Sequence, residues 1–134
     1  MPPKPPLQAT FRPGLSGSVR LDVGEADTAE ALGSGDVPVL GTPRLVGLCE
    51  QASLAALGPA VSPDQTTVGM RVHVDHLAPT QVGGVVTAEA TLEKVEGRKL
   101  TFTVTVRDRC SLVAAGRVTR VVVDRDRFLS KASG

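Results

Sequence analysis

Aromatic side chains are scarce in this chain of 134 residues, which has no tryptophan, no tyrosine and three phenylalanines. Proteins that bind single-stranded nucleic acid stack the bases on such side chains, so this class of function is disfavoured. Neither sign of charge dominates, because 15 lysines and arginines stand against 14 aspartates and glutamates. The sequence contains no basic block either, and we expect no nucleic-acid partner.

Cysteines and long apolar runs are also few. Cys49 and Cys110 are the two cysteines, and their spacing fits neither a metal site nor a disulfide framework. We expect two free thiols in a reducing compartment, with no metal and no cofactor. The first residues, MPPKPPLQ, lack the apolar centre of a signal peptide, and no run is long enough to span a membrane. The sequence therefore predicts a soluble cytoplasmic protein with a single domain.

Proline is concentrated at the start of the chain, where residues 1–13 contain five of the ten prolines. This composition is typical of extended or disordered chain. We expect a flexible N-terminal tail over residues 1–14, a folded domain over 15–128 and a C-terminal tail over 129–134. The N-terminal tail has either no role or the role of an arm that packs on a partner subunit.

Residues 42–57, TPRLVGLCEQASLAAL, predict a helix that is apolar on nearly every face. Thr42 suits the N-cap and Pro43 the first helical position, and Gly58 with Pro59 ends the helix. A helix that is apolar all round belongs in a core. Glu50 is the exception, and we expect it to have a partner because glutamate is almost never fully buried alone.

Several other segments alternate apolar with polar residues or are rich in valine and threonine, which is typical of strands. The last three of these segments are joined by short turns and predict an antiparallel meander. A single apolar helix needs a sheet curled about it, so the predicted fold class is α+β, with an antiparallel sheet wrapped around one long central helix. The predicted strands cover residues 16–23, 66–77, 85–95, 99–109 and 112–124.

The connection 24–41 between the first strand and the helix is long, and we expect one short helical stretch within it, at 24–32. Connections of this length are uncommon unless they cover a site or are mobile. Two interpretations stay open, a lid over a site and a simple connector.

The strand predicted at 66–77 contains both histidines of the chain. A period of two places His73 on the polar face with Arg71 and Asp75, where we expect it to be solvated. His76 falls on the apolar face, together with Val68, Met70, Val72 and Val74. His76 is therefore the histidine expected to face the helix.

In this fold three residues suited to acyl transfer converge, Thr42 and Glu50 on the helix and His76 on the strand. A hydroxyl, a carboxylate and an imidazole supply a nucleophile, a base and a group that handles the proton of the leaving group. Each also has an ordinary structural explanation, as an N-cap, a buried carboxylate with a partner and a core histidine. The spacing of these residues alone does not decide between the catalytic and the structural explanation.

Several motifs occur together in the folded domain. Thr42 is followed by Val46–Leu48 (VGL) and by Glu50, eight residues after the threonine, and His76 precedes a turn with proline and glycine at 79–83. The meander turn at 95–98 reads VEGR. In these motifs the chain resembles the fluoroacetyl-CoA thioesterase family of the hotdog fold, over residues 15–128.

The resemblance implies a hotdog homodimer that hydrolyses an acyl-CoA thioester to free acid and thiol. It implies that Thr42, Glu50 and His76 are catalytic, with either Thr42 or Glu50 attacking the carbonyl. It also implies that the backbone around Gly83 lies near the substrate. Arg44, close to the start of the helix, is a further candidate to bind an anionic part of the ligand.

The chain departs from the resemblance at the lid. The fluoroacetyl-specific members carry phenylalanines before the helix and just inside it, whereas this chain has Gly33–Asp36 and Pro43–Arg44 there. We therefore expect a short or medium acyl chain in place of fluoroacetyl.

Two alternatives to a thioesterase stay open. One is a non-catalytic hotdog protein that binds acyl thioesters or another small molecule, and the other is a hydratase of enoyl thioesters. The opposite orientations of Asp75 and His76 on their strand argue against the hydratase.

Overall fold

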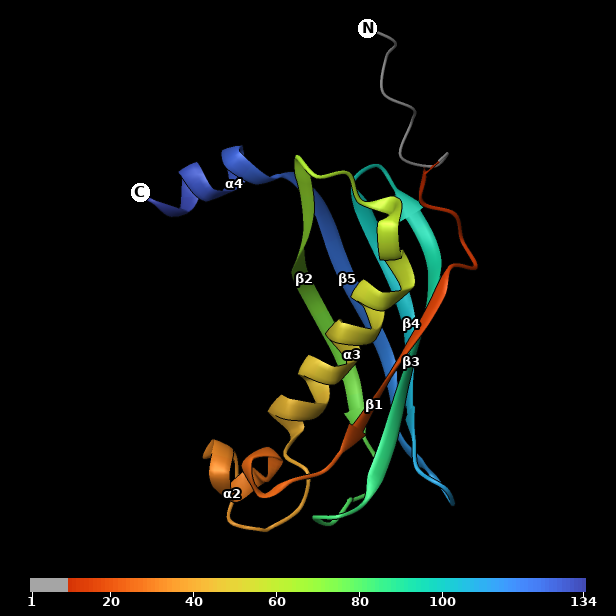
Figure 1. Cartoon of the computed structure of the whole chain (residues 1–134), viewed down its shortest axis with the longest axis vertical. Coiled ribbons are helices and arrows are strands. Elements are labelled where there is room, and N and C mark those ends of the chain that lie inside the picture. The colour runs from red at the N-terminus through yellow and green to blue at the C-terminus, as the bar shows by residue number, and fades with distance from the viewer. Residues whose placement is uncertain (1–9) are drawn as a thin grey trace, which may run out of the picture.

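The computed structural model describes residues 10–134 and shows one antiparallel sheet packed against a long helix (Figure 1). The strand order is β1-β3-β4-β5-β2, so β1 and β2 are the edge strands. The α+β class, the single long helix and the β3–β4–β5 meander are as predicted. The strands are β1 (Ser16–Asp22), β2 (Gln65–His76), β3 (Val85–Glu96), β4 (Lys99–Arg107) and β5 (Leu112–Asp124).

The long helix is α3 (Thr42–Leu57), and it crosses one face of the sheet (Figure 1). Gly58, with φ of 50°, ends it as predicted. The connection before α3 contains η1 (Glu25–Asp27) and α2 (Ala29–Leu32), which confirms the short helical stretch, and η2 (Gly58–Ala60) follows α3. No helix in the described range 10–134 has the length and apolar character needed to cross a membrane.

The core lies between α3 and the inward side chains of β3, β4 and β5. Leu45, Leu48 and Ala52 of α3 are fully buried there, as is Phe102 at the centre of the sheet. The helix packs closest to β1 and β3. A Cβ at Gly17 of β1 would lie 2.3 Å from the backbone nitrogen of Ala56, so only glycine permits this approach.

The helix is less enclosed than its sequence predicts. Leu54 is 47% exposed, and Gln51 and Ala55 are exposed beside it. Because α3 leans towards β1 and β3, the side of the helix nearest to β2 is open. The expectation of a helix buried on every face is therefore wrong for one α3 face.

Strand β2 contains a bulge that the sequence pattern does not reveal. Its pairing with β5 runs from Gly69 opposite Arg120 directly to Arg71 opposite Thr119, which leaves Met70 as an extra residue. A bulge of one residue exchanges the two faces of a strand. The prediction that Val68 shares a face with His76 is therefore wrong, whereas the prediction that His76 faces α3 is confirmed by its contact with Thr42.

Both ends of the described chain are more ordered than the sequence suggests. The predicted flexible tail 1–14 lies in part outside the described residues, but Phe11 is buried in the core and the backbone N–H of Gly14 donates to the carbonyl of Leu92. The last residues of the tail are therefore packed, because a phenylalanine gains more from the core than from solvent. At the other end, helix α4 (Arg125–Ala132) was not predicted.

Candidate active site

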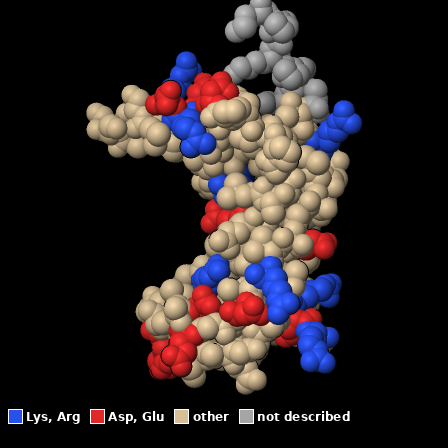
Figure 2. Space-filling view, in the orientation of Figure 1, with Lys and Arg blue, Asp and Glu red and all other residues tan. Residues whose placement is uncertain are grey.

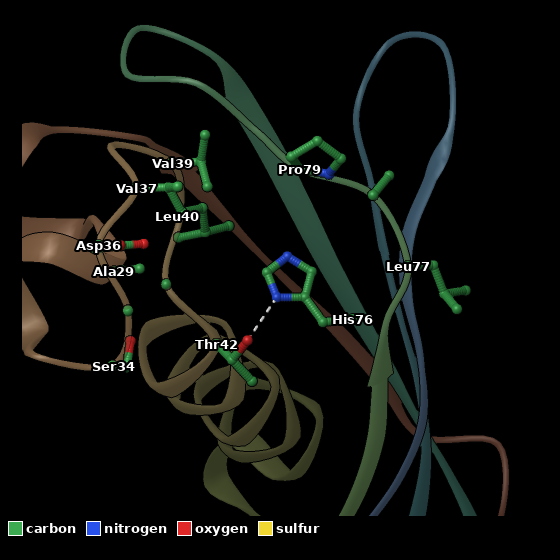
Figure 3. Close-up of a pocket in the computed structure, with 13 residues that line it drawn as sticks. Ala29, Ser34, Asp36, Val37, Val39, Leu40, Thr42, His76, Leu77 and Pro79 are labelled. Atoms are coloured by element: carbon green, nitrogen blue, oxygen red, sulfur yellow. Dashed lines mark hydrogen bonds between the residues drawn. The ribbon is translucent and has the colours of Figure 1, made fainter.

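Thr42 begins α3 and His76 ends β2, and the fold brings their side chains into contact. Thr42 Oγ1 lies 2.9 Å from His76 Nδ1 (Figure 3). The prediction that Thr42 caps the helix is wrong, because the N-cap is Gly41 and no side chain of the described residues caps this end. The Thr42 hydroxyl is consequently available to the imidazole.

The environment of His76 favours its neutral form. Burial lowers the pKa of the imidazole from its usual 6.5, and the backbone of Ala78 opposes this shift to a smaller extent. Its Nε2 atom is buried and has no partner with hydrogen-bond geometry within residues 10–134. With the ring proton on Nε2, Nδ1 accepts the proton of the Thr42 hydroxyl, which is the arrangement of a nucleophile and its base.

A pocket of about 360 Å³ opens beside these two side chains. Its other wall is the connection before α3, from which Asp36, Val37 and Leu40 face His76 in Figure 3. That segment is held in place by backbone bonds, such as the one from Leu40 N–H to the Thr80 carbonyl at 2.8 Å. No aromatic side chain other than His76 lines this pocket within the described chain.

Glu50 lies apart from the Thr42–His76 pair within one chain. Its Oε2 accepts a hydrogen bond of 3.0 Å from Nη1 of Arg120, and a Cβ at Gly69 would lie 2.6 Å from the same oxygen. Eight residues of helix separate Thr42 from Glu50, which is a rise of about 12 Å. The structure therefore brings two of the three predicted catalytic residues together and places the third beside β2.

Arg120 is a residue that the sequence analysis missed. It is 7% exposed, and it also donates from Nε to Thr67 Oγ1 and from Nη2 to the Thr67 carbonyl, both at 2.9 Å. The expected partner of Glu50 is thus an arginine in β5. A signal was present, since Arg120 alternates with Val118 and Val122 on the apolar face of that strand.

The two predicted substrate-binding residues lie outside the Thr42–His76 pocket. The guanidinium of Arg44 forms an ion pair with Asp27, with Nε 3.1 Å from Oδ1, and also donates to Gln51. Gly83 has φ of 90° in the turn before β3 and lines a different, neighbouring pocket. Their roles in binding stay predictions.

The structure offers no alternative nucleophile among the thiols. Burial, followed by the charge of Glu50, raises the pKa of Cys49 to about 11, so its thiolate is strongly disfavoured. Cys110 is exposed on the β4–β5 turn. Over residues 10–134, no three His, Cys, Asp or Glu side chains are grouped to hold a metal ion.

Comparison with known proteins agrees with this architecture. The sequence pattern of the fluoroacetyl-CoA-specific thioesterase family, FlK, matches residues 23–126. The chain belongs to this family. A fluoroacetyl-CoA thioesterase of Streptantibioticus cattleyicolor is 34% identical over 93 residues, which cover 69% of this chain and 67% of the relative.

Solved structures of similar proteins have the same fold. A mutant of the FlK thioesterase in complex with acetyl-CoA matches with a TM-score of 0.86 and 28% identity, over 92% of this chain and 97% of that one. A hot-dog-like protein from Thermanaerovibrio acidaminovorans matches with a TM-score of 0.86 and 25% identity, over 94% and 93%. The predicted hotdog fold and thioesterase family are confirmed.

Proposed function

We propose that this enzyme hydrolyses an acyl-CoA thioester to free acid and thiol, and that the reaction takes place at Thr42 and His76. Membership of the thioesterase family supports the reaction. The observation that supports the site is the 2.9 Å contact between the Thr42 hydroxyl and a histidine kept neutral by burial.

In the proposed reaction His76 takes the proton of Thr42 as the oxygen attacks the thioester carbonyl carbon. The carbon–sulfur bond breaks, and the thiolate leaves with the proton from His76. Water, deprotonated by His76, then attacks the acyl-threonine and releases the acid. Glu50 is the alternative nucleophile or base, and its carboxylate is held by Arg120.

The pocket supports a short or medium acyl chain. Val37, Val39 and Leu40 supply apolar wall opposite His76, in a volume of about 360 Å³. The absence of phenylalanine from this wall, within the described chain, agrees with the departure seen in the sequence.

We further propose a homodimer formed through the free edge of β2. Met70 is 49% exposed and Val72 is exposed on this edge, and Leu54 is exposed on the open side of α3. In Figures 1 and 2 the same edge is concave between α4 and the region of α2, and charged side chains gather towards the two ends of the molecule. An apolar strand edge with unpaired backbone groups invites pairing with a second chain.

A dimer of this kind gives Glu50 a place in the reaction. Two antiparallel β2 strands bring the Gln65 end of one copy towards the His76 end of the other. Glu50 lies beside the middle of β2, at Gly69, and the second copy would bring its own Glu50 closer to the Thr42–His76 pair. We propose that each active site combines Thr42 and His76 of one copy with Glu50 of the other.

The experiment that tests the reaction is thiol release from a panel of acyl-CoA thioesters of different chain length. Thr42→Ala and His76→Ala should each lose roughly 10²–10⁴-fold in kcat/KM, as expected for loss of a nucleophile or its base. Thr42→Ser keeps the hydroxyl and should retain much of the rate. Full turnover in both alanine variants would contradict the site, and binding of thioesters without turnover would indicate a binding protein.

Mixed dimers test the shared site. A dimer of one Glu50→Gln chain and one Thr42→Ala chain contains one intact site if the sites are shared, and none if each lies within a single chain. We expect about half of the parental rate from purified mixed dimers by this site count, although both parent variants are inactive. No recovery would contradict a shared site.

We also propose a cytoplasmic location. It is supported by Cys49 and Cys110, which are both free thiols.

A further inference from the structure

The face of the sheet that points away from α3 contains a small polar hollow. Its volume is about 220 Å³, and it is lined by side chains of β2, β3, β4 and β5. Along β4 the buried Leu100 and Phe102 point towards the core, so Thr101 between them lies on the opposite face. The sheet itself therefore separates this outer hollow from α3 and from the Thr42–His76 pocket.

Two threonines form the floor of the outer hollow. Thr101 of β4 pairs with Thr119 of β5, and Thr119 also pairs with Arg71 of β2, so the three side chains form one row on the same face. Thr119 is 7% exposed, and Thr101 is half-buried. Neither hydroxyl forms a hydrogen bond within the part of the chain that the structure describes. Both hydroxyls can therefore donate to a ligand in the hollow.

Two cations beside this floor have no carboxylate partner. Arg71 and Lys99 line the hollow, and neither forms an ion pair within residues 10–134. The carboxylate that lines the hollow, Glu96, lies 3.7 Å from the ammonium group of Lys94. Its charge is thus offset by a cation that does not line the hollow, and the charges of Arg71 and Lys99 are left for a ligand.

Arg117 supplies further donors on the same face. Its Nε donates to Glu93 at 3.1 Å, whereas its two Nη groups form no hydrogen bond with the described residues. His73 lies directly opposite Arg117 in the pairing of β2 with β5 and also lines the hollow. Hydroxyl, guanidinium and ammonium donors thus converge on one small volume.

We propose that the outer hollow binds a phosphate group, held by the two threonine hydroxyls and by the cations around them. A concave surface lined mainly by cations concentrates its field on an anion. Phosphate suits this set better than a carboxylate because it offers more acceptor oxygens, and two of them match the fork of a guanidinium. Two sources fit this chemistry, inorganic phosphate and a small phosphomonoester.

The proposed site does not depend on the proposed hydrolysis, because it lies across the sheet from Thr42 and His76. Pairing of two β2 strands would use backbone groups at the strand edge. The side chains of Arg71 and His73 on the outer face would stay accessible in such a dimer.

Calorimetric titration of the full chain with sodium phosphate tests the site. Arg71→Gln and Lys99→Gln should each weaken phosphate binding by about tenfold, the effect of one lost charge-assisted contact. Arg20→Gln is the matched control, because Arg20 is an exposed arginine on β1 that does not line the hollow. It should bind phosphate as the parent does. The ionic strength is held constant, since salt screens exposed charges.

Thr119→Val tests the floor of the hollow. It should weaken phosphate binding, and Thr119→Ser should restore it. The valine variant should melt no lower than the parent, because the hydroxyl that it removes has no hydrogen-bond partner among residues 10–134. A lower melting temperature with unchanged phosphate binding would show a structural hydroxyl and overturn the assignment.

The remaining outcomes are equally decisive. A parent that binds no phosphate would overturn the inference, as would equal losses in Arg20→Gln and Arg71→Gln, because binding would then be spread over the surface. Glycerol 3-phosphate identifies the source of the phosphate group. If Arg71→Gln weakens binding of both probes, the site is supported, and the probe that the parent binds more tightly indicates whether a phosphomonoester or the free ion is the ligand. Neither titration involves turnover, so failure of this site leaves the proposed hydrolysis untouched.

Discussion

Replacing Arg120 with methionine should destabilise the protein through a network that is visible only in three dimensions. The guanidinium joins β5 to β2 through two bonds of 2.9 Å to Thr67 and joins the sheet to α3 through the 3.0 Å contact with Glu50. Methionine keeps most of the apolar stem but none of the donors. Arg120→Met therefore removes the hydrogen bonds without creating a large cavity.

The expected loss follows from the burial of each partner. Thr67 is buried, so its carbonyl and hydroxyl lose partners where water does not easily replace them. The Glu50 side chain is 34% exposed and can turn to solvent, which limits its share. Together these terms amount to about 2–4 kcal/mol in the free energy of unfolding. For a chain of this length that is a fall in melting temperature of roughly 6–16 °C.

Thermal unfolding followed by circular dichroism measures this change. Arg117→Met is the matched control, since Arg117 lies three residues away on β5 in an exposed ion pair of 3.1 Å with Glu93. We expect its melting curve to overlap that of the parent, because exposed ion pairs contribute little. If Arg120→Met also overlapped the parent curve, the buried network would not stabilise the fold and the reasoning would be refuted.

Three further results are expected. Because burial lowers the pKa of His76 below 6.5, kcat/KM should stay constant as pH falls through 6.5 and decline only at lower pH. The parent should also lose stability relative to His76→Asn as pH falls from 6.5 through that lowered pKa. A rate that already halves at pH 6.5 would contradict the lowered pKa. Gly17→Ala should lower the free energy of unfolding by about 1–3 kcal/mol or more in chemical denaturation, since its Cβ would overlap the backbone of Ala56. Gly24→Ala is the control and should unfold like the parent, because its Cβ would lie 3.6 Å from its nearest neighbour. Met70→Lys should shift the mass measured by light scattering from that of a dimer to that of a monomer. Val82→Lys, at an exposed turn position, should leave the mass unchanged. If the Met70→Lys variant had the same mass as the parent, this would contradict pairing through β2.

The local pattern of the chain was sufficient for most elements of the fold. Alternation over residues 85–95 and 112–124 agrees with β3 and β5 to within one residue. Each strand presents one face to the core, so apolar and polar residues alternate along its sequence. The end of α3 is equally local, because Gly58 readily adopts the positive φ that ends the helix, and Pro43 has a fixed φ that suits the first turn. Such features need no knowledge of distant contacts.

The site required more than pattern. The alternation predicted that His76 faces the helix, and its residue type with Thr42 indicated acyl transfer, but neither revealed that Gly41 caps the helix and frees the threonine hydroxyl. The bulge at Met70 follows from the register of β2 on β5. Register depends on how two whole strands pair, and one extra residue has no signature in the alternation of a single strand.

The sequence by itself determined the element types, their order and the presence of a carboxylate where apolar residues were expected. Tertiary structure alone decided that Glu50 pairs with Arg120, 70 residues further on, and that Thr42 and not Glu50 contacts His76. It also decided that the buried Thr80 hydroxyl has no hydrogen-bond partner among residues 10–134. The physical reason is the range of the interactions. Backbone propensity and amphipathic period act between near neighbours, whereas the partner of a buried charge or hydroxyl is chosen by the packing of helix against sheet.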